Sequence, residues 1–208
     1  MILTRTPLRV SFVGGGSDLP AFYTKERGAV LSSTIDKYVY LCVNRRFDQQ
    51  IRIGYNKTEI VSEVDHIQHP LVREALKMFH ITGGIEIVSL ADIPADGTGL
   101  GSSSSFTVGL LNALNKYSGK DATPEELAHI ACEIEIKKCN GILGKQDQYS
   151  AAYGGFNLIE FHPDESVKVK PLQIDQKFKE YLNEHCMFFY TGIGRKASLI
   201  LEKVSESL

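Results

Sequence analysis

Glycines and serines crowd one segment of the chain, between a predicted strand and a predicted helix. The segment reads PADGTGLGSSSSF and runs from Pro94 to Phe106. Its three glycines permit backbone conformations that other residues avoid, so successive N–H groups can converge on one point. The free N–H groups and the positive dipole end of the following helix favour an anion there. The segment therefore predicts a phosphate-binding loop, Gly97–Ser105, which we call the GLGS loop.

A tight strand-to-helix turn with a serine N-cap is the alternative for the GLGS loop. Four serines and three glycines exceed what a cap needs. A Walker A loop has lysine after its last glycine, where this chain has Ser102. A Rossmann GxGxxG pattern must close on glycine, but from Gly97 it closes on Ser102 and from Gly14 on Leu19. A dinucleotide-dependent dehydrogenase is therefore disfavoured.

A second strand-then-glycine segment, RVSFVGGGSDLPAFY, runs from Arg9 to Tyr23. We call its residues Gly14–Asp18 the GGGSD loop. Glycines let a ligand approach the backbone, and Asp18 could accept hydrogen bonds from sugar hydroxyls. A turn in which Asp18 caps a short helix explains the same residues equally well.

Charged residues also stand at a predicted helix start in GKQDQYSAAYGG, from Gly144 to Gly155. Asp147 could cap that helix, act as a general base, or orient a nucleophilic hydroxyl. Lys145 could stabilise charge that develops on a transferred phosphoryl group.

Glu133 and Glu135 lie in the helix before that segment, about 200° apart around its axis. Only one of the two can therefore face the GLGS loop. A carboxylate there could bind a cation on phosphates. The alternative, for either one, is a solvated surface glutamate.

Residue periodicity predicts the elements that must position these groups. Strands are predicted over Leu8–Val13, Ala29–Ile35, Tyr38–Arg46, Ile51–Tyr55, Glu59–Val64, Ile85–Leu90, Phe156–Phe161, Val167–Pro171 and Cys186–Tyr190. Helices are predicted over Pro20–Lys25, Leu71–Phe79, Ser102–Lys116, Lys145–Tyr153, Asp175–Asn183 and Arg195–Val204. Another helix begins at the capping box of Thr123 and Glu126 and should run to about Cys139. The order of strands, helices and strands indicates an α+β or two-layer α/β fold.

Composition limits the classes of function. The chain has 208 residues, of which 43% are hydrophobic and 23% charged, and its net charge is −2. These values fit one globular domain without the basic field of a nucleic-acid binder. We find no apolar run long enough for a signal peptide or a membrane span. Four cysteines without metal-site spacing predict reduced thiols, so we expect a cytoplasmic protein.

In their order, these motifs resemble the GHMP kinases, whose phosphate-loop signature is a proline followed by GLGSSS. Here the signature is Pro94 with Gly99–Ser104, and four residues instead of the family's usual three separate proline and GLG. RTPLRVSFVGGGSDLPAFY together with GKQDQYSAAYGG is similar to the sugar-1-kinase branch, most of all to kinases of D-glycero-D-manno-heptose 7-phosphate. The resemblance covers the chain from Arg5 to Ser198.

The resemblance implies ATP and Mg²⁺ as cofactors and phosphoryl transfer to the anomeric hydroxyl of a sugar phosphate, in the synthesis of nucleotide-activated heptose. It implies that Asp147 and Arg9 are catalytic and that Ser103 and Glu135 bind the metal, which selects Glu135 over Glu133. The implied phosphate contacts are Gly97, Gly99, Leu100, Gly101, Ser102, Ser103 and Ser104, and the implied sugar contacts are Gly15, Gly16, Ser17, Asp18 and Lys145.

Two other functions remain as alternatives: another sugar-1-kinase, similar to fucokinase or galactokinase, or a catalytically silent module that binds nucleotide or sugar. Arg9, Glu135 and Asp147 together favour the enzyme. A distal sugar phosphate would need a cation, for which the candidates are Lys37, Arg45, Arg46, Arg195 and Lys196.

The resemblance also implies a domain arrangement. Residues 1–190 would form the family's N-terminal ATP-binding domain, with a ribosomal-protein-like βαβ fold. Residues 191–208 would begin a truncated, ferredoxin-like C-terminal domain, because the family's third glycine-rich motif does not follow Tyr190. We expect an exposed apolar face where that domain would dock, which could drive homo-oligomerisation.

Overall fold

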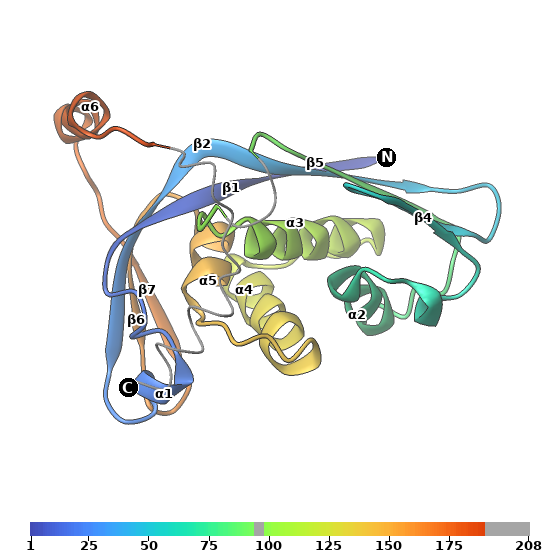
Figure 1. The fold of residues 1–208 in the computed structure, drawn as a ribbon, viewed down its shortest axis with the longest axis horizontal. Helices are drawn as coiled ribbons and strands as arrows, with labels where there is room; N and C mark the ends of the chain where they lie inside the picture. Colours follow the sequence, from blue (N-terminus) through green and yellow to red (C-terminus); the bar gives the residue numbers. More distant parts are fainter. Residues whose placement is uncertain (94–97, 190–208) are drawn as a thin grey trace.

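A computed structural model describes residues 1–93 and 98–189 as one mixed sheet with a layer of helices on one face (Figure 1). The strand order is β4-β3-β5-β2-β6-β7, and β1 pairs with β2 beside this path. β3 runs parallel to β5, and the other described pairs are antiparallel. The strands are β1 (Ile2–Val13), β2 (Gly28–Arg45), β3 (Ile51–Gly54), β4 (Thr58–Val61), β5 (Ile85–Ala91), β6 (Phe156–Phe161) and β7 (Val167–Pro171).

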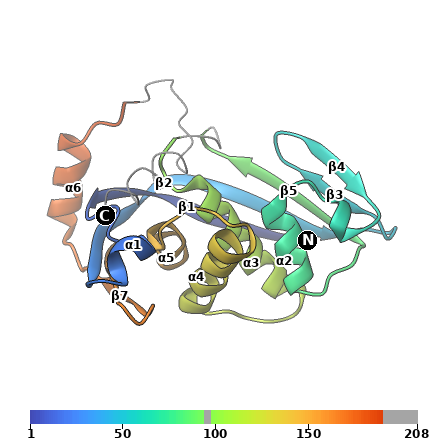
Figure 2. The ribbon, with the colours of Figure 1, turned by 60° about the horizontal axis from the view of Figure 1, so that its bottom comes forward.

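The helices follow the glycine loops and the capping signals of the sequence. They are α1 (Pro20–Tyr23), α2 (Pro70–Met78), α3 (Ser102–Tyr117), α4 (Pro124–Cys132), α5 (Gln146–Tyr153) and α6 (Gln176–His185), with a short 3₁₀ helix at Val64–His66. Figure 2 shows α3, α4 and α5 side by side beneath β1 and β2. The predicted α+β, two-layer class is confirmed.

β2 is one continuous strand, so the prediction of two strands, Ala29–Ile35 and Tyr38–Arg46, is wrong. Its first half pairs with β6 and its second half with β5. β1 pairs along both halves, with register shifts between Pro7 and Arg9 and between Ser11 and Val13. Irregularities of this kind bend a strand pair without ending it. The bend lets the first half of β2 run down beside α5, while its second half runs over α3 (Figure 1).

The helix that begins at Thr123 changes type before it ends. The capping box is present, because Thr123 Oγ1 accepts from Glu126 N and Glu126 Oε2 accepts from Thr123 N. The α-helical part stops at Cys132, and Glu133–Lys138 forms a π-helix. The predicted helical run to about Cys139 is confirmed, and its last six residues form a π-helix. Such turns are rare and frequently lie at functional sites.

Two apolar clusters hold the helices against the sheet. The larger one includes Leu41, Val43 and Ile87 from the sheet with Leu110 and Leu114 from α3, all 0–1% exposed. Burying each such side chain contributes about 1.5–3 kcal/mol. The smaller cluster joins β2 and β6 to α4 and α5. α3 lies so close to β1 and β2 that a Cβ on Gly109 would stand 2.6 Å from Thr6 Oγ1.

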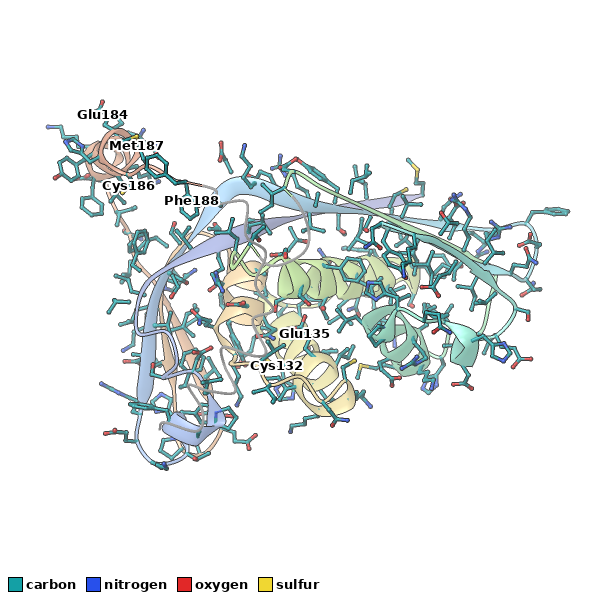
Figure 3. The ribbon with its side chains drawn as sticks, viewed as in Figure 1. Cys132, Glu135, Glu184, Cys186, Met187 and Phe188 are labelled. Atoms are coloured by element: carbon teal, nitrogen blue, oxygen red, sulfur yellow. The ribbon has the colours of Figure 1, made fainter. Side chains whose placement is uncertain are left out.

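The described chain ends beside α6, away from the helical layer (Figure 1). No residue of α6 is buried. Cys186–Phe189 has no assigned strand, contrary to the predicted strand Cys186–Tyr190, because no neighbouring strand pairs with it. Met187 and Phe188 are 80% and 70% exposed (Figure 3). The predicted helix Arg195–Val204 and the predicted domain start at 191–208 lie outside the described residues.

Candidate active site

An ion pair joins β1 to the first turn of α5. Arg9 Nε donates to Asp147 Oδ1 at 2.7 Å, and Arg9 Nη2 lies 2.5 Å from the same oxygen. The Arg9 side chain is 10% exposed and that of Asp147 is 26% exposed. Charge-assisted contacts of this length are among the stronger hydrogen bonds in proteins. The structure therefore brings the two predicted catalytic residues into direct contact at the edge of solvent.

Arg9 also fixes the path of the GLGS loop. Its backbone N–H donates to Leu100 O at 3.0 Å, and its Nη1 donates to Gly99 O at 2.7 Å. Gly99 and Gly101 have φ values of +71° and +73°, which favour glycine. The arginine thus ties the catalytic carboxylate and the loop together.

Gly101 stands directly against the ion pair. A Cβ on Gly101 would lie 3.3 Å from Arg9 Cγ and 3.4 Å from Asp147 Oδ2. Gly101 is also the N-cap of α3, and a glycine has no side chain with which to cap. The alternative of a serine N-cap is therefore wrong. The N-terminal end of α3, with its positive dipole end, therefore lies at the ion pair without a side-chain cap.

The four serines behind Gly101 differ in their surroundings. Ser105 Oγ donates to Pro7 O at 2.7 Å and so anchors α3 to β1. Ser104 is buried, Ser102 is half-buried, and Ser103 is exposed at the start of the helix. Gly97 lies outside the described residues.

Glu135 is the buried carboxyl group of the site, at 1% exposure (Figure 3). Its Oε2 accepts from Ser104 Oγ at 2.7 Å and from Gln148 Nε2 at 2.5 Å. Its Oε1 accepts from Thr107 Oγ1 at 2.5 Å. Burial raises the pKa of Glu135, and the three hydrogen bonds act in the opposite direction. The group links α3, α5 and the π-helix.

The two glutamates of the π-helix differ in exposure, since Glu135 is buried and Glu133 is not. This agrees with the prediction that only one of the two faces the GLGS loop. Glu133 is partly exposed and pairs with Lys138 at 3.5 Å. The predicted metal pair of Ser103 and Glu135 is not in contact, because Ser104 is the serine that reaches the carboxylate. Sequence reasoning missed Thr107 and Gln148. Thr107 lies one helical turn after Ser103, and that spacing is the signal that could have found it.

The oxygen atoms around Glu135 fit a magnesium ion. They come from the Glu135 carboxylate and the Ser104 hydroxyl. Gln148 turns its Nε2 to the carboxylate, and its Oε1 is buried with no hydrogen-bond partner in the described chain. No cluster of three or more His, Cys, Asp or Glu side chains occurs in residues 1–93 and 98–189. Mg²⁺ often binds one carboxylate and takes its other ligands from phosphates and water.

The GGGSD loop is tied to β2 and to α5. Ser17 Oγ lies 2.7 Å from Gly14 O and accepts from Ala29 N at 3.0 Å. Gly15 is exposed, and Gly16 N donates to Asp18 Oδ1 at 3.0 Å. The loop therefore presents its glycine backbone to solvent and uses its serine internally.

Asp18 caps a helix distant in sequence. Its Oδ2 accepts from Gln146 N, 128 residues away, at 3.1 Å. The N-cap of the short helix α1 is Leu19, so the alternative that Asp18 caps that helix is wrong. Asp18 is 2% exposed, and burial raises the pKa of its carboxyl group. A Cβ on Gly144 would lie 1.8 Å from Asp18 Oδ2, so glycine is required there.

Lys145 points away from Asp147. Its Nζ donates to Glu165 O at 3.0 Å and lies 4.5 Å from the centre of the Tyr23 ring. Partial burial lowers the pKa of Lys145. The structure does not bring this ammonium group to the ion pair. Of the candidate cations for a distal phosphate, Arg46 is paired with Asp48 at 2.7 Å.

Residues 68–155 match the family model described as GHMP kinases N terminal domain. The chain is 31% identical to D-glycero-alpha-D-manno-heptose 7-phosphate kinase of Campylobacter jejuni, over 97% of this chain and 62% of that protein. It is 28% identical to L-fucokinase/L-fucose-1-P guanylyltransferase of Bacteroides fragilis, over 98% of this chain and 25% of that protein.

The fold has solved counterparts. The crystal structure of a D-glycero-D-manno-heptose 1-phosphate kinase from Bacteroides thetaiotaomicron superposes with a TM-score of 0.81 and 28% identity, over 88% of this chain and 63% of that one. The chain thus spans less than two thirds of the length of these relatives. No helix in the described residues is long and apolar enough to cross a membrane. The sequence relatives and the fold agree with the family match: residues 68–155 resemble the N-terminal domain of the GHMP kinases, and the chain is similar to kinases of this family over most of its length.

Proposed function

We propose that this chain is the nucleotide-binding part of a sugar kinase, which transfers the γ-phosphate of MgATP to the anomeric hydroxyl of a sugar phosphate. The observation that carries the proposal is the Arg9–Asp147 ion pair, which stands against Gly101 at the start of α3. A carboxylate, a guanidinium and the positive dipole end of a helix at one point suit phosphoryl transfer. D-glycero-D-manno-heptose 7-phosphate is our first choice of acceptor, because the Campylobacter relative carries that name.

The two oxygens of Asp147 have different surroundings. Oδ1 receives both contacts from Arg9. Oδ2 faces Gly101. We propose that Oδ2 accepts the proton of the attacking sugar hydroxyl or orients that hydroxyl through a hydrogen bond. The ion pair holds the carboxylate in one direction while the sugar binds.

Arg9 has N–H groups to spare for the transferred phosphoryl group. A guanidinium has five N–H donors. Three of them serve Gly99 O and Asp147 in this structure. The others can stabilise negative charge in the transition state. Gly99–Ser104 would hold the phosphates through backbone N–H groups and serine hydroxyls, and Gly97 completes the proposed loop.

Mg²⁺, when bound, neutralises charge on the phosphates. Glu135 and a serine hydroxyl would hold it, with Ser103 at the exposed start of α3 and Ser104 already on the carboxylate. The GGGSD loop would form the sugar side of the site through Gly15, Gly16 and Asp18. The alternative acceptor class is a neutral sugar such as fucose, which the Bacteroides fragilis relative favours.

The test is ADP release from MgATP with heptose 7-phosphate, fucose, galactose and mannose 6-phosphate in turn. It is run on this chain and on a chimera that adds the remaining C-terminal part of the Campylobacter relative. We expect turnover that depends on one sugar and is highest for heptose 7-phosphate. Absence of turnover with every sugar, in both proteins, would contradict the proposal and favour a silent binding module.

A further inference from the structure

Gln146 contacts Asp18 and is the neighbour of Asp147 in the chain. It precedes Asp147 in the chain, and its backbone N–H donates to Asp18 Oδ2 at 3.1 Å. Its side-chain Nε2 lies 3.4 Å from Asp18 Oδ1. The residue therefore joins the GGGSD loop to the first turn of α5, beside the carboxylate that would activate the sugar hydroxyl.

Asp18 determines which end of the Gln146 amide is free. A carboxylate accepts hydrogen bonds and an amide group carries both donors and an acceptor. The NH₂ end must therefore face Asp18, and the Oε1 end must face elsewhere. Burial raises the pKa of Asp18. Three N–H groups, one from Gly16 and two from Gln146, nevertheless point at the Asp18 oxygens, so both oxygens act as acceptors.

Gln146 Oε1 has no donor. It is buried, and residues 1–93 and 98–189 offer it no hydrogen-bond partner. Buried polar atoms in native proteins are nearly always paired, so an unpaired acceptor calls for a missing donor. Hydroxyl groups are the donors that a sugar supplies.

Two glycines keep the surroundings of Gln146 clear. A Cβ on Gly144 would collide with Asp18, and the lack of one lets the carboxylate reach the amide. Gly15 is exposed, and a Cβ there would lie 3.9 Å from Gln146 Nε2 and 4.0 Å from Ser11 Oγ. The GGGSD loop therefore places an exposed residue without a side chain next to the amide.

We propose that Gln146 determines acceptor specificity by accepting a hydrogen bond at Oε1 from one ring hydroxyl of the sugar, while Asp18 positions its amide. The proposal rests on the proposed function, because the sugar must be the acceptor of that reaction. It separates two roles: Gln146 contacts the sugar hydroxyl, and Asp18 holds the amide in the orientation that makes this contact.

The test compares the parent with Gln146→Leu on heptose 7-phosphate and on its 2-, 3- and 4-deoxy analogues, in whichever protein of the ADP-release assay turns over. In the parent, one analogue should lose about tenfold or more in kcat/KM, because it leaves Oε1 unpaired. In Gln146→Leu, heptose 7-phosphate should fall by a similar factor. In the same variant, kcat/KM for that one deoxy analogue should lie within about twofold of kcat/KM for heptose 7-phosphate. A double-mutant cycle gives this result when the two deleted groups contact each other.

Matched controls separate this role from a structural one. Gln176→Leu makes the same change at an exposed residue of α6 and should behave as the parent. The KM for MgATP should stay within about twofold in Gln146→Leu, since the amide faces the sugar side. Gln146→Met, unbranched and of similar length, provides the second variant if leucine lowers the melting temperature.

The outcomes distinguish the two proposals. If the parent turns over and Gln146→Leu keeps the full deoxy penalty on every analogue, the role of Gln146 is overturned and the kinase stands. A kcat/KM of Gln146→Leu equal to that of the parent would also overturn the role of Gln146. It would indicate that a water molecule, and not the sugar, donates to Oε1. If the parent turns over no sugar, the proposed function fails and the role of Gln146 fails with it.

Discussion

The two glycine loops follow a strand and precede a helix in the same way, but they differ in what surrounds their glycines. In the GGGSD loop, a Cβ on Gly14 would lie 2.0 Å from Ala29 O, inside the van der Waals contact. In the GLGS loop, a Cβ on Gly99 would meet no atom of the described residues within 4 Å. Gly14 is required because protein fills the space beside it, whereas Gly99 has open space beside it.

The hydroxyls of the two loops differ in the same direction. Ser17 Oγ is committed to Gly14 and Ala29. Ser103 is exposed at the start of α3. A glycine-rich sequence is therefore ambiguous until its neighbours are known: it indicates tight packing in one loop and room for a ligand in the other. We expect substitutions in the first to act on stability and those in the second to act on catalysis.

Arg9→Lys should produce the largest change, because Arg9 serves the open loop and the catalytic carboxylate together. Lysine keeps the charge but loses the fork that reaches both Gly99 O and Asp147. We expect kcat to fall by about 10²–10³-fold, with a melting temperature close to that of the parent. Steady-state ADP release measures kcat, and thermal unfolding measures the melting temperature. A kcat within threefold of the parent's would remove Arg9 from its proposed role.

Gly14→Ala should act on stability. The residue has φ of +92°, and its new Cβ would collide with the Ala29 carbonyl. Strain and overpacking together should lower the free energy of unfolding by about 3 kcal/mol. Urea unfolding gives this value, and MgATP affinity per folded molecule should not change. A weak effect on stability with a large loss of nucleotide affinity would reverse the assignment of the two loops.

Gly101→Ala should act on the nucleotide. Its Cβ would stand beside Arg9 and Asp147 at 3.3–3.4 Å, where a phosphate is proposed to bind. We expect kcat/KM for MgATP to fall about tenfold, and the positive φ to lower stability by about 1 kcal/mol. Gly99→Ala is the matched control, with a similar φ but open surroundings. Equal effects of the two substitutions on kcat/KM would show that backbone strain, and not the lost space, is the cause.

Glu135→Gln tests the buried carboxyl group under the open loop. Because burial raises its pKa above the ordinary value of 4.5, the parent loses stability as pH rises beyond that value. The amide variant should match the parent near pH 4. Without metal at pH 8, the amide variant should be the more stable of the two. Urea unfolding across this range measures the difference, and a difference that shrinks with pH would contradict the raised pKa.

The sequence was sufficient for features that depend on neighbours along the chain. The capping box at Thr123 and Glu126 is complete within four residues. The GLGS loop followed by a helix depends only on glycines, serines and apolar spacing. These signals are local, so the start of α3 and the start of α4 could both be predicted.

Features that depend on distant contacts could not be predicted. Asp18 caps α5 across 128 residues, and no local pattern announces it. Glu135 turns inward in a π-helix, where its carboxylate meets Ser104 and Thr107 of another helix. Lys145 stands beside Asp147 in the chain, yet it turns toward Tyr23. Adjacent residues on a helix point about 100° apart, so neighbours in sequence need not share a site.

The most direct test of the site is Asp147→Asn, compared with the parent for MgATP binding by calorimetry and for sugar-dependent ADP release. The asparagine keeps the shape of the side chain but is a far weaker base. We predict MgATP affinity within about threefold of the parent and turnover lower by about 10²–10⁴-fold. Turnover equal to that of the parent would contradict the account, because Asp147 would then neither accept the proton nor orient the hydroxyl.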